Sequence, residues 1–427
     1  MARNRIMKYA RLRADLETLA QFGRDPGGGH TRQAYTIADI EARRWLAQQM
    51  VNAGLEVQLD PAANVIGRLP ATVEKGEAAA LLIGSHIDTV PNGGALDGAL
   101  GVLAGLEVVR RLQDESAIRI RPLDIIAFED EEGRFGAFTG SRVMMGELDP
   151  SQLAQMRDAG GVALGAALES VGLSIDEFPK ALRSIERIAG YLELHIEQGP
   201  ILERKGLGVG IVNAIAGQVR FSVRFDGRPD HAGSTPMSDR KDAFAAAALF
   251  ATKLRQTVID QGRDGAVMTI GIVKVEPGVG NIVPSHARLG LEIRDTDKAR
   301  LGTLAAATEQ EAETAAKAHN LIVRCRKLYQ VDPVQMHPRL CEELKRSAQM
   351  LGLNFLVMPS PAGHDAQVVG RHAPSAMIFV PSKGGRSHCP EEATEWSDIE
   401  QGVDLLYEAT VRLLRDSQSL ATTESGN

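Results

Sequence analysis

The alternation of apolar and polar positions divides the chain into three stretches of different character. From the N-terminus to residue 216, short apolar runs alternate with helical periods, which is typical of strands buried on both faces and covered by helices. Over 217–330 the strands alternate apolar and polar residues, which indicates sheets with one wet face. After 331 the apolar runs return. We therefore predict one large α/β domain, 1–216 and 331–427, interrupted by an inserted domain, 217–330.

Each domain has its own predicted order of elements. In the large domain we expect helices at 6–22, 41–53, 98–112 and 398–414, strands at 55–59, 64–69, 81–86, 123–128, 191–195 and 376–380, and a mostly helical, Ala-rich segment at 151–190. In the inserted domain we expect strand 218–225, helix 241–261, strands 267–275 and 287–294, helix 298–319 and strand 321–328. This β-α-β-β-α-β order predicts a ferredoxin-like α+β fold.

Composition narrows the function classes. The 427 residues carry a net charge of -7 and no long Lys/Arg block, which argues against nucleic-acid binding. No apolar run approaches the ~20 residues that span a bilayer, so we expect no membrane segment. The three cysteines lack metal-type spacing and suit a reducing compartment. The basic N-terminus lacks the apolar core of a secretory signal, so we expect a helix there and a cytoplasmic protein.

Ionisable residues follow four of the predicted buried strands. His86, the pair Glu131 and Glu132, His195 and His388 each come just after an apolar run. In open α/β sheets, ligands bind beyond the carboxyl ends of the strands. Imidazole and carboxylate groups together suit first-row divalent metals, and a cation relieves the repulsion between gathered carboxylates. The alternatives are hydrogen-bonded structural histidines and a solvated acidic turn.

Six motifs rich in glycine, histidine and acidic residues are spread over nearly the whole chain. They are GSHIDTVPNGGALDG at 84–98, AFEDEEG at 127–133, ELHIEQGP at 193–200, DHAGSTPM at 230–237, AGHDA at 362–366 and SHCPEE at 387–392. On these motifs the chain resembles the M20 family of metal-dependent amidases and peptidases. Within that family it is most similar to the hydantoinase/carbamoylase branch, which contains N-carbamoyl-L-amino-acid hydrolases, allantoate amidohydrolases and β-ureidopropionases.

The resemblance implies a large mixed-sheet α/β domain that binds two divalent ions, of zinc, manganese or cobalt. It implies that His86 and His195 bind one ion, that Glu132 and His388 bind the other, and that Asp97 bridges the two. Two ions a few Å apart share one anion, and a carboxylate can bridge them.

Three further residues receive catalytic roles from the resemblance. Asp88 accepts a hydrogen bond from the far nitrogen of His86 and so orients that ring. Glu131 stays off the metals and acts as general base. His231 stabilises the oxyanion, supplied from the neighbouring subunit of a homodimer. Without the family context, an exposed turn histidine is the favoured interpretation of His231.

The substrate contacts implied by the resemblance are Gln198, Asn281, Arg294, Gly363, His364 and Gly385. The Arg294 fork suits bidentate binding of a carboxylate. A surface salt bridge from Arg294 to Asp295 or Asp297 is the competing interpretation, and Gly363 and Gly385 are equally compatible with ordinary turns.

The predicted reaction is hydrolysis of an N-carbamoyl-L-amino acid to the amino acid, ammonia and carbon dioxide, by a homodimer paired through the inserted lid domain. Allantoate and β-ureidopropionate are alternative substrates. A non-catalytic ureido-acid binder and an M20 dipeptidase are alternatives of other kinds. Cys389 beside His388 invites a Cys/His nucleophile, but His388 is already assigned to a metal, so we expect Cys389 to be inert.

Overall fold

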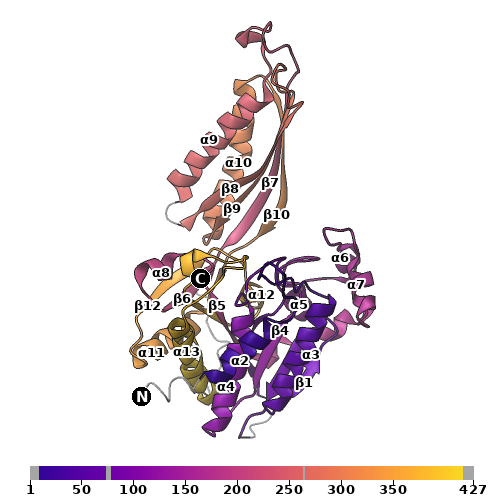
Figure 1. The fold of residues 1–427 in the computed structure, drawn as a ribbon. Helices are drawn as coiled ribbons and strands as arrows, with labels where there is room; N and C mark the ends of the chain where they lie inside the picture. Colours follow the sequence, from indigo (N-terminus) through magenta and orange to yellow (C-terminus); the bar gives the residue numbers. More distant parts are fainter. Residues whose placement is uncertain (1–8, 74–77, 263–264, 417–427) are drawn as a thin grey trace. The chain divides into compact units, whose positions relative to one another are not determined.

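The computed structural model describes residues 9–73, 78–262 and 265–416, and its chain divides into two compact units (Figure 1). The large unit is formed by Met1–Asn213 and Met336–Asn427, and the inserted unit is Ala214–Gln335. The sequence-based proposal placed the inserted domain at 217–330. Each unit has its own sheet and its own buried apolar residues.

The large unit is built on a nine-stranded sheet in the order β1-β2-β4-β3-β5-β13-β6-β11, with β12 pairing to β6. The short last strand, β11, falls within the residues 214–335 that are assigned to the inserted unit. The strands are β1 Glu56–Leu59, β2 Val65–Leu69, β3 Ala80–His86, β4 Leu123–Phe128, β5 Ile188–Ile196, β6 Val209–Ile215, β11 Val334–Gln335, β12 Phe355–Ser360 and β13 Ser375–Val380. The central strands β4, β3, β5 and β13 are parallel, whereas β1, β2, β6 and β11 pair antiparallel with their neighbours. The predicted large mixed sheet is confirmed.

Every residue of the four parallel strands is buried. This explains why these strands have continuous apolar runs in the sequence, since both faces of a central parallel sheet are covered. Helix α4, Ala99–Asp114, contacts β3, β4 and β5, and helix α13, Trp396–Arg415, contacts β5 and β13. These strands are therefore packed against helices along their length.

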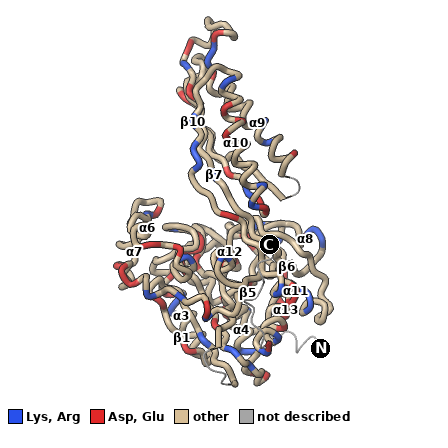
Figure 2. Tube along the Cα trace, turned by 180° about the vertical axis from the view of Figure 1, so that it is seen from behind, with Lys and Arg blue, Asp and Glu red and all other residues tan. Residues whose placement is uncertain are grey.

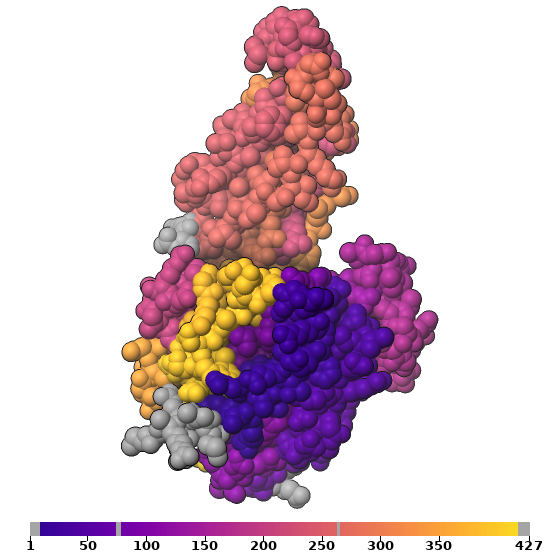
Figure 3. Space-filling model, viewed as in Figure 1, coloured from indigo at the N-terminus to yellow at the C-terminus, as the bar shows by residue number. Residues whose placement is uncertain are grey.

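Further helices of the large unit are α2 Ala10–Leu19, α3 Ile37–Asn52, α5 Thr139–Met144, α8 Ile201–Lys205, α11 Pro338–Met350 and α12 Asp365–Val369. Helix α3 begins at Ile37, where Thr36 caps it by accepting a hydrogen bond from the backbone N–H of Asp39. The indigo N-terminal and yellow C-terminal segments lie side by side (Figure 3). There the Arg13 guanidinium stacks 4.5 Å from the Trp396 ring centroid. None of the helices in the described ranges has the length and apolar content needed to cross a bilayer.

The mostly helical prediction for 151–190 is confirmed in part, because the helical pieces are short and interrupted. The segment contains only α6, Pro150–Gln155, α7, Leu164–Ser170, and two short 3-10 turns at Ile175–Ala181 and Ile185–Arg187 before β5 begins. Glycines with left-handed backbone separate these pieces, with φ of 83° at Gly161 and 81° at Gly172. Alanine content favours helix, but glycine in this conformation ends one.

The inserted unit has the predicted ferredoxin-like order. Its strands are β7 Gly217–Asp226, β8 Val267–Glu276, β9 His286–Asp295 and β10 Ile322–Val331, and its helices are α9 Ala243–Gly262 and α10 Lys298–Ala318, with a 3-10 turn at Met237–Asp239. The sheet order β10-β7-β9-β8 is antiparallel throughout. Apolar residues of β7 and β9 pack with α9 and α10 in one core, which leaves the other side chains of these strands on a solvated face.

The solvated face of this sheet carries a row of cations. Arg324 pairs in register with Arg224, Arg224 with Arg288, and Arg288 with Lys274. Blue segments along β7 and β10 show part of this row (Figure 2). Asp226 offsets some of the charge, because its carboxylate pairs with Arg224 and Arg324.

Candidate metal centre and active site

The four parallel strands bring the predicted metal ligands to one edge of the sheet. His86 is the last residue of β3, and His195 is the penultimate residue of β5. Glu131 and Glu132 follow the end of β4, and His388 lies on the loop after β13. Because these strands are neighbours and parallel, their carboxyl ends meet, and side chains that are up to three hundred residues apart become close.

Asp97 lies between two sets of donors and presents a different oxygen to each. Its Oδ1 is 3.1 Å from Nε2 of His195 and 3.8 Å from Nε2 of His86. Its Oδ2 is 3.1 Å from Nε2 of His388. Two groups of three potential ligands result, each with ligand atoms within 4.8 Å of one another: His86, Asp97 and His195, and Asp97, Glu132 and His388. A carboxylate in this position can bridge two cations.

The electrostatics of the cluster fit divalent cations. Burial and the charge of Asp97 raise the pKa of Glu132 to about 7, and burial, with Glu132 nearby, raises the pKa of Glu131 well above its usual range. The hydrogen bond to Asp97 raises the pKa of His388 to about 9. Without a cation, protons must therefore offset the gathered negative charge. A pair of divalent ions coordinated by these same groups would replace those protons.

The imidazole rings of His86 and His195 are oriented with Nε2 toward Asp97. Nδ1 of His195 is 2.9 Å from the carbonyl oxygen of Ile196, and the backbone N–H of Gly98 approaches Nε2 at 3.3 Å. These contacts favour the tautomer with the proton on Nδ1 and a lone pair on Nε2, which is the form that binds a metal. Gly98 itself allows this approach, because a Cβ there would lie 2.4 Å from the His86 ring, and its φ is 63°.

Asp88 contacts the His86 ring, as predicted, and also the backbone of Glu131 and Glu132. Nδ1 of His86 is 3.0 Å from the backbone carbonyl of Asp88 and 3.5 Å from its carboxylate, so the shorter contact is with the main chain. The carboxylate instead accepts hydrogen bonds from the backbone N–H groups of Glu131, at 3.3 Å, and Glu132, at 3.1 Å. Asp88 therefore connects the turn that bears both glutamates to the end of β3.

The loops beside Asp97 hold two residues in left-handed backbone conformations. Gln198 has φ of 57° and His388 has φ of 56°, values that non-glycine residues adopt rarely and that cluster at functional sites. The side-chain amide of Gln198 donates to Oδ2 of Asp97 at 2.9 Å. The structure thus places Gln198 directly against the predicted bridging carboxylate.

The other substrate contacts predicted in the large unit, His364, Gly363 and Gly385, pack closely against neighbouring residues of the protein. His364 is 1% exposed; its Nε2 is 2.9 Å from the Ser360 hydroxyl and its ring centroid is 4.5 Å from that of His195. A Cβ at Gly363 would lie 2.7 Å from the Phe138 ring, and one at Gly385 would lie 2.8 Å from the backbone nitrogen of Pro200. Close packing is therefore enough to explain both glycines.

In the inserted unit, the structure brings His231 and Asn281 together. His231 forms an isolated bridge with Ile282, and the backbone N–H of Ala232 donates to the carbonyl of Asn281 at 2.9 Å. Nδ1 of His231 accepts from the backbone of Gly233 at 3.0 Å and of Ser234 at 3.1 Å. These contacts favour a ring proton on Nε2, so this exposed imidazole is oriented as a hydrogen-bond donor.

Arg294 lies on the solvated face of the same sheet, near the end of β9. Its Nε donates to Oε1 of Glu292, and Oε2 of Glu292 accepts from Nε of Arg220 at 2.8 Å. The competing interpretation named Asp295 and Asp297 as salt-bridge partners. Asp295 instead pairs with Arg300.

Sequence reasoning gave no role to three residues around the centre. Glu193 is buried within β5 and accepts hydrogen bonds from Ser85, Tyr191 and the backbone of Ala366. The sequence feature that could have identified Glu193 is a charged residue inside an apolar run. Ser387 and Glu392 approach Asp97 from the loop after β13, and only their place in the SHCPEE motif marked them.

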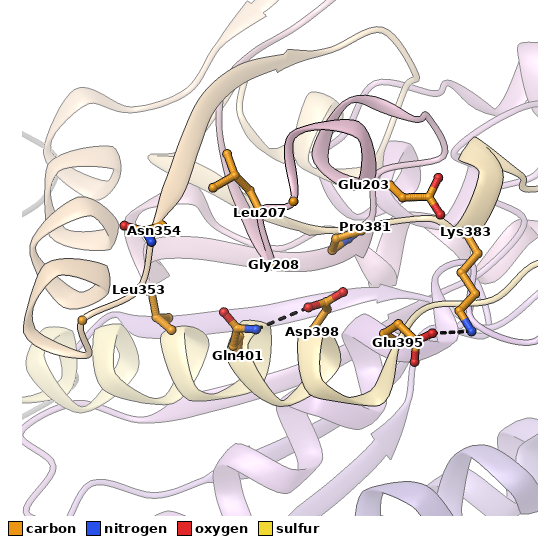
Figure 4. Close-up of a pocket in the computed structure, with 12 residues that line it drawn as sticks. Glu203, Leu207, Gly208, Leu353, Asn354, Pro381, Lys383, Glu395, Asp398 and Gln401 are labelled. Carbon is orange, nitrogen blue, oxygen red and sulfur yellow. Dashed lines mark hydrogen bonds and ion pairs between the residues drawn. The ribbon is translucent and has the colours of Figure 1, made fainter.

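A cavity of about 370 Å³ lies elsewhere in the large unit and contains none of the candidate site residues. Figure 4 shows its polar groups largely paired: Nζ of Lys383 is 2.6 Å from Glu395, and the amide of Gln401 donates to Asp398 at 3.3 Å. We assign no ligand to it.

Comparison with known proteins gives consistent matches over almost the whole chain. The family model for Peptidase family M20/M25/M40 matches residues 82–412. An N-carbamoyl-L-amino acid amidohydrolase of Geobacillus stearothermophilus is 38% identical over 411 residues, which cover 96% of this chain and 99% of that protein. An allantoate amidohydrolase of Escherichia coli strain K12 is 36% identical, covering 92% of this chain and 94% of that protein.

Solved structures agree with the sequence comparison. A hydantoinase/carbamoylase family amidase from Burkholderia phymatum superimposes with a TM-score of 0.86 at 36% identity, covering 95% of this chain and 97% of that one. The likeness therefore includes the inserted unit as well as the large unit.

Proposed function

We propose that this chain, which belongs to Peptidase family M20/M25/M40, is a two-metal amidohydrolase that cleaves the C–N bond of a ureido acid. The substrate that we put first is an N-carbamoyl-L-amino acid, hydrolysed to the amino acid, ammonia and carbon dioxide. The observation that carries the proposal is the placement of Asp97, whose two carboxylate oxygens face separate sets of nitrogen and oxygen donors.

One metal would be held by His86, His195 and Asp97, and the other by Asp97, Glu132 and His388. Mixed imidazole and carboxylate donors suit zinc, manganese or cobalt. When bound, such a pair lowers the pKa of water toward neutrality and polarises the carbonyl to be attacked.

Glu131 is the proton carrier in this proposal. Its carboxylate is 3.6 Å from Nε2 of His86, and it lies in a further group of potential ligands with His86 and Glu132 but in neither of the two groups that contain Asp97. A carboxylate beside the metals can accept a proton from the attacking water and then give it to the leaving nitrogen. Asp88 fixes the backbone from which Glu131 projects.

The inserted unit supplies the contacts to the substrate carboxylate and to the developing oxyanion. We assign the carboxylate of the substrate to Arg294 and Asn281, and the developing oxyanion to Nε2 of His231. A guanidinium that shares its present carboxylate partner with Arg220 can exchange it for a substrate carboxylate.

Allantoate is the second candidate substrate, favoured by the 36% identity to the allantoate amidohydrolase of Escherichia coli. It carries the same two recognisable groups, a ureido carbonyl and a carboxylate. A non-catalytic binder is disfavoured because Glu131 and all five proposed ligands are present and, in the large unit, gathered at one sheet edge.

The test is ammonia release from a panel of N-carbamoyl-L-amino acids, β-ureidopropionate, allantoate and dipeptides. Metal-free protein should be reconstituted separately with manganese, cobalt and zinc. We expect metal-dependent ammonia release from a ureido acid. Cleavage of a dipeptide with no ammonia from any ureido compound would contradict the proposal.

We further propose a cytoplasmic homodimer paired through the inserted unit. The three cysteines are all free thiols in the structure, which suits a reducing compartment. Sedimentation analysis of the full chain tests the dimer, and a monomer that retains full activity would contradict both the pairing and the supply of His231 by a partner.

A further inference from the structure

One buried carboxylate ties together the two loops that meet at the metal centre. Oε1 of Glu392 accepts hydrogen bonds from the backbone N–H groups of Leu96, at 2.9 Å, and Asp97, at 3.0 Å. Oε2 of the same side chain accepts from the hydroxyl of Ser387 at 2.8 Å. The first contacts lie on the loop between β3 and α4, and the second lies next to His388 on the loop after β13.

The first loop is shaped around this carboxylate. A Cβ at Gly94 would lie 2.1 Å from Cδ and Oε1 of Glu392, so only glycine allows the backbone to pass so close. Glu392 is 8% exposed, and its buried charge is met by two main-chain donors and one hydroxyl. A buried acceptor with this many directed donors fixes the relative position of the groups that donate to it.

Ser387 completes the connection on the side of His388. Its hydroxyl is 2.8 Å from Glu392 and 3.1 Å from Oδ2 of Asp97, so it lies between the two carboxylates. The loop that bears it is closed on itself, because the backbone N–H of Lys383 donates to the carbonyl of Ala393 at 2.8 Å. Glu392 therefore joins the main chain of Asp97 to the loop that carries His388.

We propose that Glu392 is a positioning residue that sets the separation of Asp97 and His388, and thereby the geometry of the ion held by Asp97, Glu132 and His388. The inference rests on the proposed two-metal function. His86 and His195 belong to strands β3 and β5, so Asp97 is the one ligand of the other ion whose backbone Glu392 contacts, whereas the clamp contacts the backbone of Asp97 and the neighbour of His388 at the first ion. Loss of Glu392 should therefore weaken one of the two metal-binding events far more than the other.

The adjacent residue provides a matched control. Glu391 is an exposed carboxylate on the same loop that pairs with Arg386 at 3.0 Å and contacts no residue of the centre in the described structure. Glu391→Gln removes the same charge one residue away. Glu392→Gln keeps a carbonyl oxygen for the two backbone donors and can donate its amide to the Ser387 hydroxyl, so it serves as the conservative replacement.

The experiment is titration of metal-free full-length protein with Co²⁺, followed by calorimetry and by the visible absorption of the bound ion. For Glu392→Ala we expect one binding event to weaken by about 10- to 100-fold, the usual effect of removing a partner that orients metal ligands. The other event should keep the wild-type affinity. Glu392→Gln should lie near wild type, and Glu391→Gln should match it.

Two further measurements keep a general folding defect separate from a positioning role. The thermal unfolding midpoint of each metal-free variant is recorded first. If Glu392→Ala does not fold, Glu392→Asp decides, because it keeps the charge but is too short to reach both loops, and it should show the same selective loss. Equal weakening of both events, or wild-type affinity for both in a folded Glu392→Ala or Glu392→Asp protein, would overturn the inference.

The proposed function is tested by Co²⁺ binding and ammonia release of the wild-type protein alone. A wild-type protein that binds two Co²⁺ ions and releases ammonia from a ureido acid supports that function whatever the Glu392 variants do. A wild-type protein that binds no Co²⁺ contradicts the proposed function itself, and with it the premise of the clamp.

Discussion

The two units carry their candidate site residues in opposite ways. In the large unit, His86 and His195 are each 1% exposed and Asp97 is 5% exposed, and their polar atoms contact one another. In the inserted unit, His231 and Asn281 are exposed, and His231 is oriented by main-chain contacts. Burying several carboxylates and imidazoles together is costly unless they are paired. The large unit therefore holds an arrangement that makes physical sense with cations, whereas the inserted unit presents groups that fold equally well without a ligand.

This difference separates the expected consequences of substitution. Changes near Asp97 should alter chemistry, metal affinity or both. Changes at the exposed groups of the inserted unit should alter substrate binding and leave metal binding alone. His388 is intermediate, because its side chain is 49% exposed while its Nε2 still contacts Asp97.

The largest expected effect is on turnover, from Glu131→Gln. We expect kcat to fall by about 10²- to 10⁴-fold, since a general base that moves protons in the transition state typically contributes that much. Metal content, measured by mass spectrometry after dialysis, should stay at the wild-type value. If the variant instead loses an ion, Glu131 is a ligand and its role has been exchanged with that of Glu132.

The next effect tests whether the two units are energetically separate. Phe250 is 0% exposed in α9 and packs against Phe225, with 5.9 Å between ring centroids. Phe250→Ala should reduce the free energy of unfolding of the inserted unit by about 3–5 kcal/mol through lost burial and a cavity. Differential scanning calorimetry measures this loss. The affinity for Co²⁺ should not change, and a matching drop in metal affinity would show that the metal centre depends on the inserted core.

A smaller effect is expected for Arg294→Lys. Lysine cannot reproduce the bidentate fork, so KM for a carboxylate-bearing ureido substrate should rise about tenfold, equivalent to ~1.4 kcal/mol, with little change in kcat. Arg220→Lys is the matched control, because Arg220 shares the Glu292 carboxylate with Arg294. The same rise in KM for both variants, or for a neutral amide substrate, would remove the proposed role.

The sequence was most informative where burial dictates residue type. The strands β3, β4, β5 and β13 could be located because each is covered on both faces and therefore apolar throughout. The strands β7 and β9 could be located because one face is wet and the pattern alternates. Short elements such as α12, Asp365–Val369, have too few residues for a period, and the glycines of 151–190 overrode its alanine content.

Site residues divide in a similar way. Strand ends predicted the clustering of His86, His195 and Glu132, because neighbouring parallel strands share an edge. The partners of Asp88 and the clamp of Glu392 could not be predicted, since both depend on which backbone N–H groups a loop presents. Periodicity carries no information about loop conformation.

The smallest expected effect concerns Cys389, the neighbour of His388. Its side chain is a partly exposed free thiol, and within the described residues it makes no hydrogen bond to the carboxylates of the centre. A nucleophilic cysteine needs a base positioned to take its proton, and Nε2 of His388 already faces Asp97 and Glu132. Cys389→Ser should therefore leave kcat and KM unchanged. Treatment with a small thiol reagent should reduce the turnover of the wild type no more than that of the variant. Loss of turnover in Cys389→Ser, with both Co²⁺ ions still bound, would show that the thiol takes part in catalysis and would contradict this assignment.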